Sequence, residues 1–237
     1  KNKNLKVYNN YNNLNQIIKK KIDYTMSSIT GLDGLEPTIN MIQKTKTIAI
    51  ANKESIICGW NIIKKKLDKY KTEFIPIDSE HFSIWSLIGN KKKNDSIDKI
   101  YITASGGPFI NLPKKKFYKI KVSDALKHPN WRMGKKITID SSTLMNKVFE
   151  VIEAKNIFNL SYKKIFILTH PKSYVHAIVK FNNGLTKILI HEPNMKIPIH
   201  NSIYQFNDKI IKSKKLNLSI LNNLEFSKLE KKKVSSN

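Results

Sequence analysis

Two neighbouring carboxylates are the first residues in this chain that suggest chemistry. In the stretch PIDSEHFSIW, Pro76–Trp85, Asp78 and Glu80 directly follow a short apolar run. If that run stays extended, both side chains point to the same side, because side chains alternate along a strand. Two hard oxygens on one side suit a divalent cation such as Mg²⁺ or Mn²⁺. The alternative is a helix N-terminus, where Asp, Ser and Glu are favoured as caps and as partners of the helix dipole.

A second cluster of polar residues lies in TIDSSTLMNKVFEVIEA, residues 138–154. On a helix, Asn146 and Lys147 would share a face with Glu150, since they precede it by four and three residues. Ser141 or Ser142 suits the N-cap of that helix, and a helix start with Ser, Asn and Lys nearby is a natural phosphate site. Glu150 would add a third carboxylate. The alternative is an ordinary amphipathic helix with charged pairs along one face.

Two strand ends offer contacts for an anion. The segment TASGGPF, Thr103–Phe109, runs from a strand into Ser105 and two glycines, whose backbone N–H groups can approach an anion, although a plain turn explains it equally well. The segment IANKES, Ile50–Ser55, places Lys53 where a strand enters a helix, either against an anionic ligand or in solvent.

A loop with large apolar side chains follows the glycine segment. In KHPNWRMGKK, Lys127–Lys136, Trp131 and Met133 stand in a polar stretch that Pro and Gly punctuate. Such residues suit a lid that closes over a ligand and excludes water. The alternative is a loop that Trp131 fastens to the core. His170 and His176 are six residues apart, which does not match a zinc signature, and we interpret them as core residues or as residues that support the site.

The composition excludes several classes of protein. The 237 residues suit one large domain or two small ones, and with 40% hydrophobic residues they can build a core. Cys58 is the single cysteine, which excludes an internal disulfide and a Cys-rich metal site. No apolar run reaches the roughly 18 residues that span a bilayer, and the polar N-terminus has no signal-peptide core. Because no initiator Met opens the chain, we expect a portion of a longer protein.

The formal net charge of +25 invites comparison with nucleic-acid-binding proteins. Of the 43 basic residues, however, only Arg132 is an arginine, and specific readers of nucleic acid depend on Arg for bidentate contacts. The lysines accompany abundant Asn and Ile, which AT-rich codons encode. We therefore expect no specific nucleic-acid partner and no membrane partner, although a cationic surface should attract anionic substrates.

The predicted elements alternate between strands and helices before ending in a hairpin. Hydrophobic spacing predicts strands at 44–52, 73–77, 99–104, 136–139, 165–169, 174–181 and 185–191. It predicts helices at 35–43, 53–70, 79–87 and 142–158. Asn182-Asn183-Gly184 is a hairpin signal between the last two strands. The expected fold class is α/β, with a parallel sheet that passes into an α+β domain.

Five motifs in order resemble one enzyme family. The segments IANKESIICGW, PIDSEHFSIW, ITASGGPF, HPNWRMGKKITIDSSTLMNKVFEVIEA and HPKSYVHAIV are similar to those of 1-deoxy-D-xylulose 5-phosphate reductoisomerases, from about Ser27 to Pro198. The resemblance implies an enzyme that makes 2-C-methyl-D-erythritol 4-phosphate with NADPH and Mg²⁺ or Mn²⁺, in the non-mevalonate isoprenoid pathway. It implies a metal-assisted skeletal rearrangement followed by hydride transfer.

The resemblance also assigns roles to individual residues. The implied metal ligands are Asp78, Glu80 and Glu150. The implied substrate-binding residues are Ser79, Ser105, His128, Trp131, Met133, Ser141, Asn146, Lys147 and Glu150. The implied catalytic residues are Lys53, Glu80 and His128. The implied cofactor-binding residues are Asn52, Lys53, Glu54 and Gly134. His176 matches a family histidine near the active site.

The resemblance further implies an organisation and leaves alternatives open. Residues 1–77 would be the remainder of a Rossmann-like NADPH-binding domain, residues 78–204 an α+β catalytic domain for metal and substrate, and residues 205–237 a linker or tail. No Gly-rich dinucleotide loop is present, so we expect that this chain alone does not turn over NADPH. The implied partners are a small phosphorylated sugar and a second copy in a homodimer, in bacterial cytoplasm or a plastid. The alternatives are a decayed gene product without catalysis and a basic nucleic-acid-binding protein.

Overall fold

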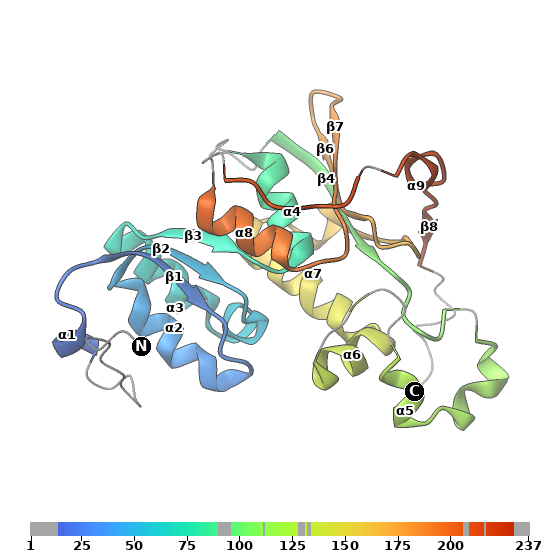
Figure 1. The fold of residues 1–237 in the computed structure, drawn as a ribbon, viewed down its shortest axis with the longest axis horizontal. Helices are drawn as coiled ribbons and strands as arrows, with labels where there is room; N and C mark the ends of the chain where they lie inside the picture. Colours follow the sequence, from blue (N-terminus) through green and yellow to red (C-terminus); the bar gives the residue numbers. More distant parts are fainter. Residues whose placement is uncertain are drawn as a thin grey trace. The chain divides into compact units, whose positions relative to one another are not determined.

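The computed structural model describes residues 14–89, 96–110, 112–127, 131, 134–205, 209–215 and 217–229. The chain separates into two compact units, Lys1–Pro76 and Ile77–Asn237, and each is described here by itself (Figure 1). Across these described ranges, no helix combines the length and the apolar character that crossing a bilayer requires.

The first unit is a parallel three-stranded sheet with helices. Its strands β1 (Ile22–Ser27), β2 (Thr45–Ile50) and β3 (Glu73–Pro76) pair in the order β1-β2-β3. Its helices are α1 (Leu14–Ile17), the 3₁₀ turn η1 (Leu32–Gly34), α2 (Leu35–Ile42) and α3 (Lys53–Tyr70). Ile48 and Ile75 are fully buried in neighbouring strands, as expected for a parallel sheet with little contact with solvent.

Helix α3 shows how the local sequence sets the element bounds. The side chain of Asn52 accepts a hydrogen bond from the backbone N–H of Ser55 at 2.6 Å and so caps the N-terminus. Ile56, Ile63 and Leu67 recur at helical spacing and are buried. The helix ends at Lys71, which adopts the left-handed conformation. The predicted helix 53–70 is therefore confirmed.

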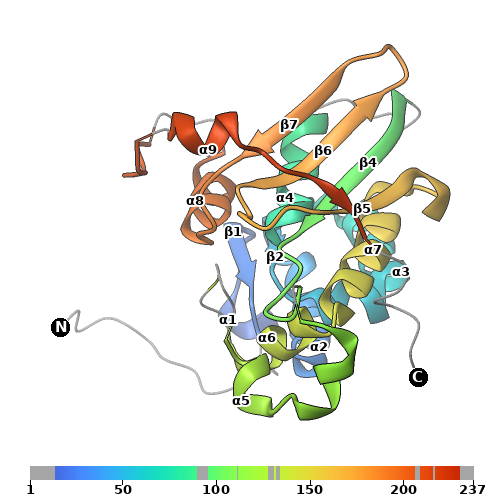
Figure 2. The same cartoon turned by 90° about the vertical axis from the view of Figure 1, so that its right-hand side faces the viewer.

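The second unit is built on a five-stranded mixed sheet in the order β7-β6-β4-β5-β8 (Figure 2). β4 pairs parallel with β5, and the other neighbours pair antiparallel. The strands are β4 (Ile97–Ala104), β5 (Ile165–Thr169), β6 (Val175–Phe181), β7 (Thr186–Ile190) and β8 (Ser227–Lys228). The helices are α4 (Ser79–Ile88), η3 (Lys114–Lys119), α5 (Val122–Ala125), α6 (Lys135–Ser142), α7 (Met145–Phe158), η4 (Tyr162–Lys164), α8 (Lys196–Tyr204) and α9 (Leu218–Asn222).

The core of the second unit joins α4 and α7 to the central strand β4. Ile84 from α4, Ala154 from α7 and Ile102 from β4 are fully buried members of one apolar cluster. Burial of this kind is the main favourable contribution to folding. This shared apolar core holds α4 and α7 against the sheet. Glu80 lies on α4 and Glu150 on α7, so the same packing positions both carboxylates.

The mixed α/β fold agrees with the expected class, and the β6–β7 hairpin is confirmed. The strand predicted at 136–139 is wrong, because these residues lie within α6. The β-branched alternation of Ile137 and Ile139 resembles a strand, yet a short apolar run cannot by itself distinguish strand from helix. The backbone N–H and hydroxyl of Thr138 both donate to the carbonyl of Gly134, four residues earlier, as in a helix.

Two other expectations also differ from the structure. Ser141 and Ser142 do not cap the helix that carries Glu150, because they form the last turn of α6. Helix α7 instead begins after Leu144, which adopts the left-handed conformation and makes no side-chain cap. In the segment expected to be a linker or tail, the described residues include α9 and β8, and β8 pairs with β5 through Ser227 and Thr169.

Replacement of a central core residue tests this packing. Ile102→Ala should lower the free energy of unfolding by about 2–5 kcal/mol, because it removes fully buried methyl and methylene groups from β4. Leu185→Ala is the matched control, since Leu185 is 56% exposed and should change stability by only about 0.5 kcal/mol. Urea unfolding followed by circular dichroism measures both, and equal effects would contradict the assigned core.

Candidate metal and phosphate site

Three carboxylates converge in the second unit. Asp78, Glu80 and Glu150 each offer an oxygen, and these oxygens lie within 4.8 Å of one another. Asp78 is the N-cap residue of α4, Glu80 lies in the first turn of α4, and Glu150 lies on α7. A helix begins directly after Asp78, as the helix interpretation of this stretch predicts, although the side chain of Asp78 makes no capping hydrogen bond. Asp78 belongs to the carboxylate cluster, and its role as a metal ligand stays a prediction.

The ammonium group of Lys147 sits among these carboxylates. Its Nζ donates to Glu150 Oε2 at 2.5 Å, to the carbonyl of Thr103 at 2.6 Å and to Glu80 Oε1 at 3.0 Å. Three such bonds use all three of its N–H groups. Burial alone would lower the pKa of Lys147, but the negative charges of Glu150 and Glu80 outweigh burial and hold that pKa above its ordinary value. The side chain is therefore a fixed positive charge.

The remaining oxygens of the same carboxylates also have donors. Asn146 Nδ2 donates to Glu150 Oε1 at 2.5 Å, and Ser79 Oγ donates to Glu80 Oε2 at 2.5 Å. Residues expected to bind substrate thus lie in direct contact with residues expected to bind metal. Three carboxylates and one ammonium leave two negative charges, and the donors are hard oxygens, so the cluster fits one divalent cation such as Mg²⁺ or Mn²⁺.

The glycine segment lies against the end of α6. Gly107 has φ +67°, and a Cβ there would lie 3.1 Å from the carbonyl oxygen of Ser141. Only glycine allows this close approach without strain. The backbone N–H of Gly107 donates to Ser105 Oγ at 3.2 Å. The structure therefore places the segments of Ser105 and Ser141 next to each other, as a shared phosphate site requires.

The loop tryptophan contacts a buried histidine. The rings of Trp131 and His176 meet edge to face at 5.8 Å, and His176 stacks on His191 at 3.6 Å. Burial, and then the neighbouring His191, lower the pKa of His176 to about 3, so His176 is neutral at physiological pH. His128 and Met133, which the resemblance also assigns to the substrate, lie outside the described residues.

The expected cofactor residues lie in two places. Asn52, Lys53 and Glu54 open α3 in the first unit, and Gly134 is the N-cap of α6 in the second. Besides capping α3, Asn52 donates through Nδ2 to the carbonyls of Ile29 and Gly31. Its amide hydrogens are thus used to shape the segment before α2.

Sequence reasoning missed four contributors to this region. Thr103 contributes through its backbone carbonyl, which no side-chain pattern could reveal. His81 and Glu153 lie three residues after Asp78 and Glu150, a helical spacing that would have placed them on the same faces. His191 follows β7 and had no motif to identify it.

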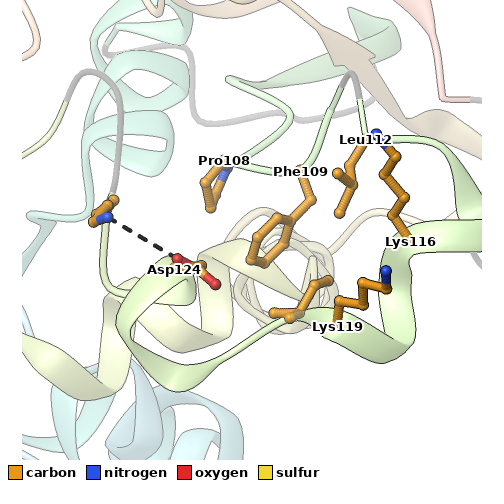
Figure 3. Close-up of a pocket in the computed structure, with 8 residues that line it drawn as sticks. Pro108, Phe109, Leu112, Lys116, Lys119 and Asp124 are labelled. Atoms are coloured by element: carbon orange, nitrogen blue, oxygen red, sulfur yellow. Dashed lines mark ion pairs between the residues drawn. The ribbon is translucent and has the colours of Figure 1, made fainter.

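A surface pocket of about 540 Å³ lies in the second unit, and Figure 3 shows the side chains that line it. Phe109 and Leu112 supply apolar surface, and Lys116 and Lys119 supply positive charge. Asp124 pairs with Lys127 at 4.0 Å at its edge. None of the metal candidates lines this pocket, so the chemistry is better placed at the carboxylate cluster.

The same enzyme family matches both parts of the sequence. The family model described as 1-deoxy-D-xylulose 5-phosphate reductoisomerase matches residues 1–59, and the model of the C-terminal domain of that enzyme matches residues 74–158. The second match contains all three carboxylates together with Asn146 and Lys147.

Curated relatives are similar over nearly the whole chain. The 1-deoxy-D-xylulose 5-phosphate reductoisomerase of Pelagibacter ubique is 66% identical over 232 residues, which are 97% of this chain and 60% of the relative. The enzyme of the same name from Clostridium tetani is 43% identical over 96% of this chain and 59% of its own length. The similarity extends beyond the Ser27–Pro198 stretch of the motifs, and the chain spans about 60% of the length of these relatives.

Solved structures of the same name share the fold. A DOX-P reductoisomerase in complex with NADPH, fosmidomycin and magnesium has a TM-score of 0.82 and 34% identity, with coverage of 90% of this chain and 54% of that one. The Zymomonas mobilis 1-deoxy-D-xylulose 5-phosphate reductoisomerase in complex with NADPH has a TM-score of 0.83 and 32% identity. The match covers 94% of this chain and 57% of that one.

Removal of the buried ammonium tests the charge balance. Lys147→Met should lower the free energy of unfolding by about 3–5 kcal/mol without divalent cations, because the buried Glu150 and its neighbour Glu80 lose their compensating charge. Lys136→Met is the control, since the side chain of Lys136 is 65% exposed and its pair with Asp140 should contribute at most about 1 kcal/mol. Urea unfolding in a chelating buffer measures both free energies. If Lys147→Met lowers the free energy of unfolding no more than Lys136→Met does, the role of Lys147 as the compensating charge is contradicted.

The buried neutral histidine should make stability depend on pH. The unfolded chain takes up a proton at His176 near its ordinary pKa of 6.5, whereas the folded pKa is about 3. The contribution of the neutral ring is complete above pH 6.5 and is lost as pH falls toward 3, with a slope of up to about 1.4 kcal/mol per pH unit. Unfolding free energies at pH 7 and pH 5 should therefore differ less in His176→Phe than in the unsubstituted chain, and an unchanged pH dependence would contradict this origin.

Proposed function

Because the chain belongs to the 1-deoxy-D-xylulose 5-phosphate reductoisomerase family, we propose that it supplies the metal and substrate site of an enzyme that converts 1-deoxy-D-xylulose 5-phosphate to 2-C-methyl-D-erythritol 4-phosphate. The observation that carries the proposal is the convergence of the carboxylates of Asp78, Glu80 and Glu150, with the ammonium of Lys147 paired to the two glutamates. The magnesium and NADPH in the names of the structural neighbours support the same pair of cofactors for this chain.

The three carboxylates would hold the cation and leave positions for two substrate oxygens. A bound divalent cation supplies Lewis-acid polarisation of those oxygens, and NADPH supplies the hydride. Asn146 and Lys147 both contact Glu150, so they lie beside a substrate hydroxyl or phosphate oxygen bound at that carboxylate. A hydrogen bond from Lys147 to the substrate would take the place of one of its three present bonds. As a fixed charge in a buried site, Lys147 would stabilise negative charge that develops on the substrate. Glu80 would act beside the reacting atoms, and Ser79 orients one of its oxygens.

The phosphate of the substrate would lie between the glycine segment and the end of α6. Ser105 and Ser141 come from these adjacent segments, and the close approach of Gly107 to Ser141 supports a shared site. Trp131 would exclude water from the bound sugar phosphate, with the neutral His176 as its packing partner. The roles of His128 and Met133 in substrate binding, and of Lys53 in catalysis, remain part of the proposal on the strength of the resemblance.

The organisation and the partners belong to the same proposal. Residues 1–77 would contribute to NADPH binding through Asn52, Lys53 and Glu54. The resemblance also assigns Gly134, in the catalytic domain at 78–204, to the cofactor. A homodimer is supported by the edge position of β7, which exposes Ile188 beside a strand edge that is unpaired in the sheet of the described residues; Leu185, directly before β7, is exposed as well. The proposed location is the bacterial cytoplasm, and nucleic acid is not a proposed partner.

Cation binding tests the proposal without requiring turnover. Mn²⁺ should bind to the chain, and Glu150→Gln should weaken that binding at least about tenfold, because it removes a charged ligand and leaves the helix intact. Glu73→Gln, an exposed position on β3, is the control and should leave Mn²⁺ affinity unchanged. Electron paramagnetic resonance of free Mn²⁺ gives the affinities.

A second probe distinguishes the alternatives. Fosmidomycin, the ligand of a structural neighbour, should bind to the chain in the presence of Mn²⁺ and lose affinity in Glu150→Gln. Mn²⁺ binding that is indifferent to Glu150→Gln, or salt-sensitive DNA binding with no response to metal or fosmidomycin, would contradict the proposed function.

A further inference from the structure

A second group of potential metal ligands lies behind the first. Asp78, His81 and Glu153 each offer one ligand atom, and these atoms lie within 4.8 Å of one another. His81 Nδ1 is 4.0 Å from Asp78 Oδ1 and 3.9 Å from Glu153 Oε2. The side chains of His81 and Glu153 are 0% and 1% exposed and that of Asp78 is 16% exposed, so two of the three ligands are fully buried, unlike the acidic clusters that are common on protein surfaces.

The hydrogen bond on the other ring nitrogen fixes the tautomer of His81. Its Nε2 lies 2.8 Å from the backbone carbonyl of Glu150. A carbonyl can only accept, so Nε2 carries the hydrogen and donates it. In the neutral ring, Nδ1 then presents a lone pair toward Asp78 and Glu153, and it has no hydrogen-bond partner among the described residues. A buried lone pair that faces two carboxylates requires a positively charged partner between them.

We propose that Asp78, His81 and Glu153 form a second cation site that binds a transition-metal ion of the Zn²⁺ type. Imidazole nitrogen and carboxylate oxygen are both ligand atoms for zinc, and imidazole favours such ions over Mg²⁺. The bond from Nε2 to a backbone carbonyl is the support that metal-binding histidines usually have. Ligands about 2.1 Å from a tetrahedral ion lie roughly 3.4 Å apart, so the observed 3.9–4.0 Å requires only small side-chain shifts.

The site would be structural and would support the first one. His81 lies on α4 and Glu153 on α7, so an ion between them ties together the two helices that carry Glu80 and Glu150. Asp78 belongs to both groups, and a carboxylate with two oxygens can contact two ions. The inference goes beyond the proposed function, because the ion takes no part in the reaction and neither His81 nor Glu153 is one of the proposed ligands of the first ion.

Paired substitutions on α7 separate the two sites. All variants are made in the full chain with Cys58→Ser, because the exposed thiol of Cys58 could itself bind zinc. Each protein is first stripped of metal and then loaded with Zn²⁺ in the presence of saturating Mg²⁺. The unsubstituted site should retain about one equivalent of Zn²⁺ after dialysis, because its ligands lie in the interior and metal binding stabilises the fold that holds them. Glu153→Gln should lose this zinc and keep Mn²⁺ binding, Glu150→Gln should do the reverse, and Asp78→Asn should weaken both. If the proposed function is wrong but the second site exists, the chain should not bind Mn²⁺ and should still retain zinc in a way that depends on Glu153.

X-ray absorption of the zinc-loaded Cys58→Ser chain gives a second measurement that does not depend on the folding of Glu153→Gln. The expected spectrum shows one imidazole and only oxygen otherwise. Three results would overturn the proposal: no retained zinc, zinc that persists in a folded Glu153→Gln, or a zinc environment with several imidazoles.

Discussion

The ammonium of Lys147 holds together three segments that are far apart in the chain. It joins the end of β4 through the carbonyl of Thr103, α4 through Glu80 and its own helix α7 through Glu150. Buried carboxylates repel one another, and each would resist burial without a compensating charge. Because one fixed positive charge contacts two of them, the cluster can be buried and still keep a net negative charge for a divalent cation. The binding site thus rests on one lysine that the surrounding acids keep protonated.

The sheet brings these groups to one place. The central strand β4 packs against α4 and α7 through Ile102, Ile84 and Ala154, and it ends beside the site. The glycine segment then turns along the end of α6 because Gly107 allows the backbone to approach Ser141. Apolar packing therefore sets the positions of the helices, and the polar contacts set the orientation of each carboxylate. The same division explains why α4 and α7 also place His81 and Glu153 together.

Much of this arrangement could be predicted from the sequence, because the strong periodic signals were local. The helix at 53–70 has an Asn cap and a regular apolar face, and both acidic stretches carry the residues that form the cluster. The strand predicted at 136–139 failed because Ile137 and Ile139 alternate as they would in a strand, while the helical bonds of Thr138 to Gly134 depend on the backbone. The contact of Lys147 with Thr103 is tertiary and uses a carbonyl, so no side-chain pattern signals it. The left-handed Leu144, which moves the start of α7 past both serines, was equally invisible.

The most direct test of the account is the position of Mn²⁺ in crystals of this chain, located by its anomalous scattering. The account predicts a peak about 2.2 Å from one oxygen each of Asp78, Glu80 and Glu150, with Lys147 still beside Glu150. Mn²⁺ held by other residues, or no peak at these carboxylates under saturating Mn²⁺, would contradict it.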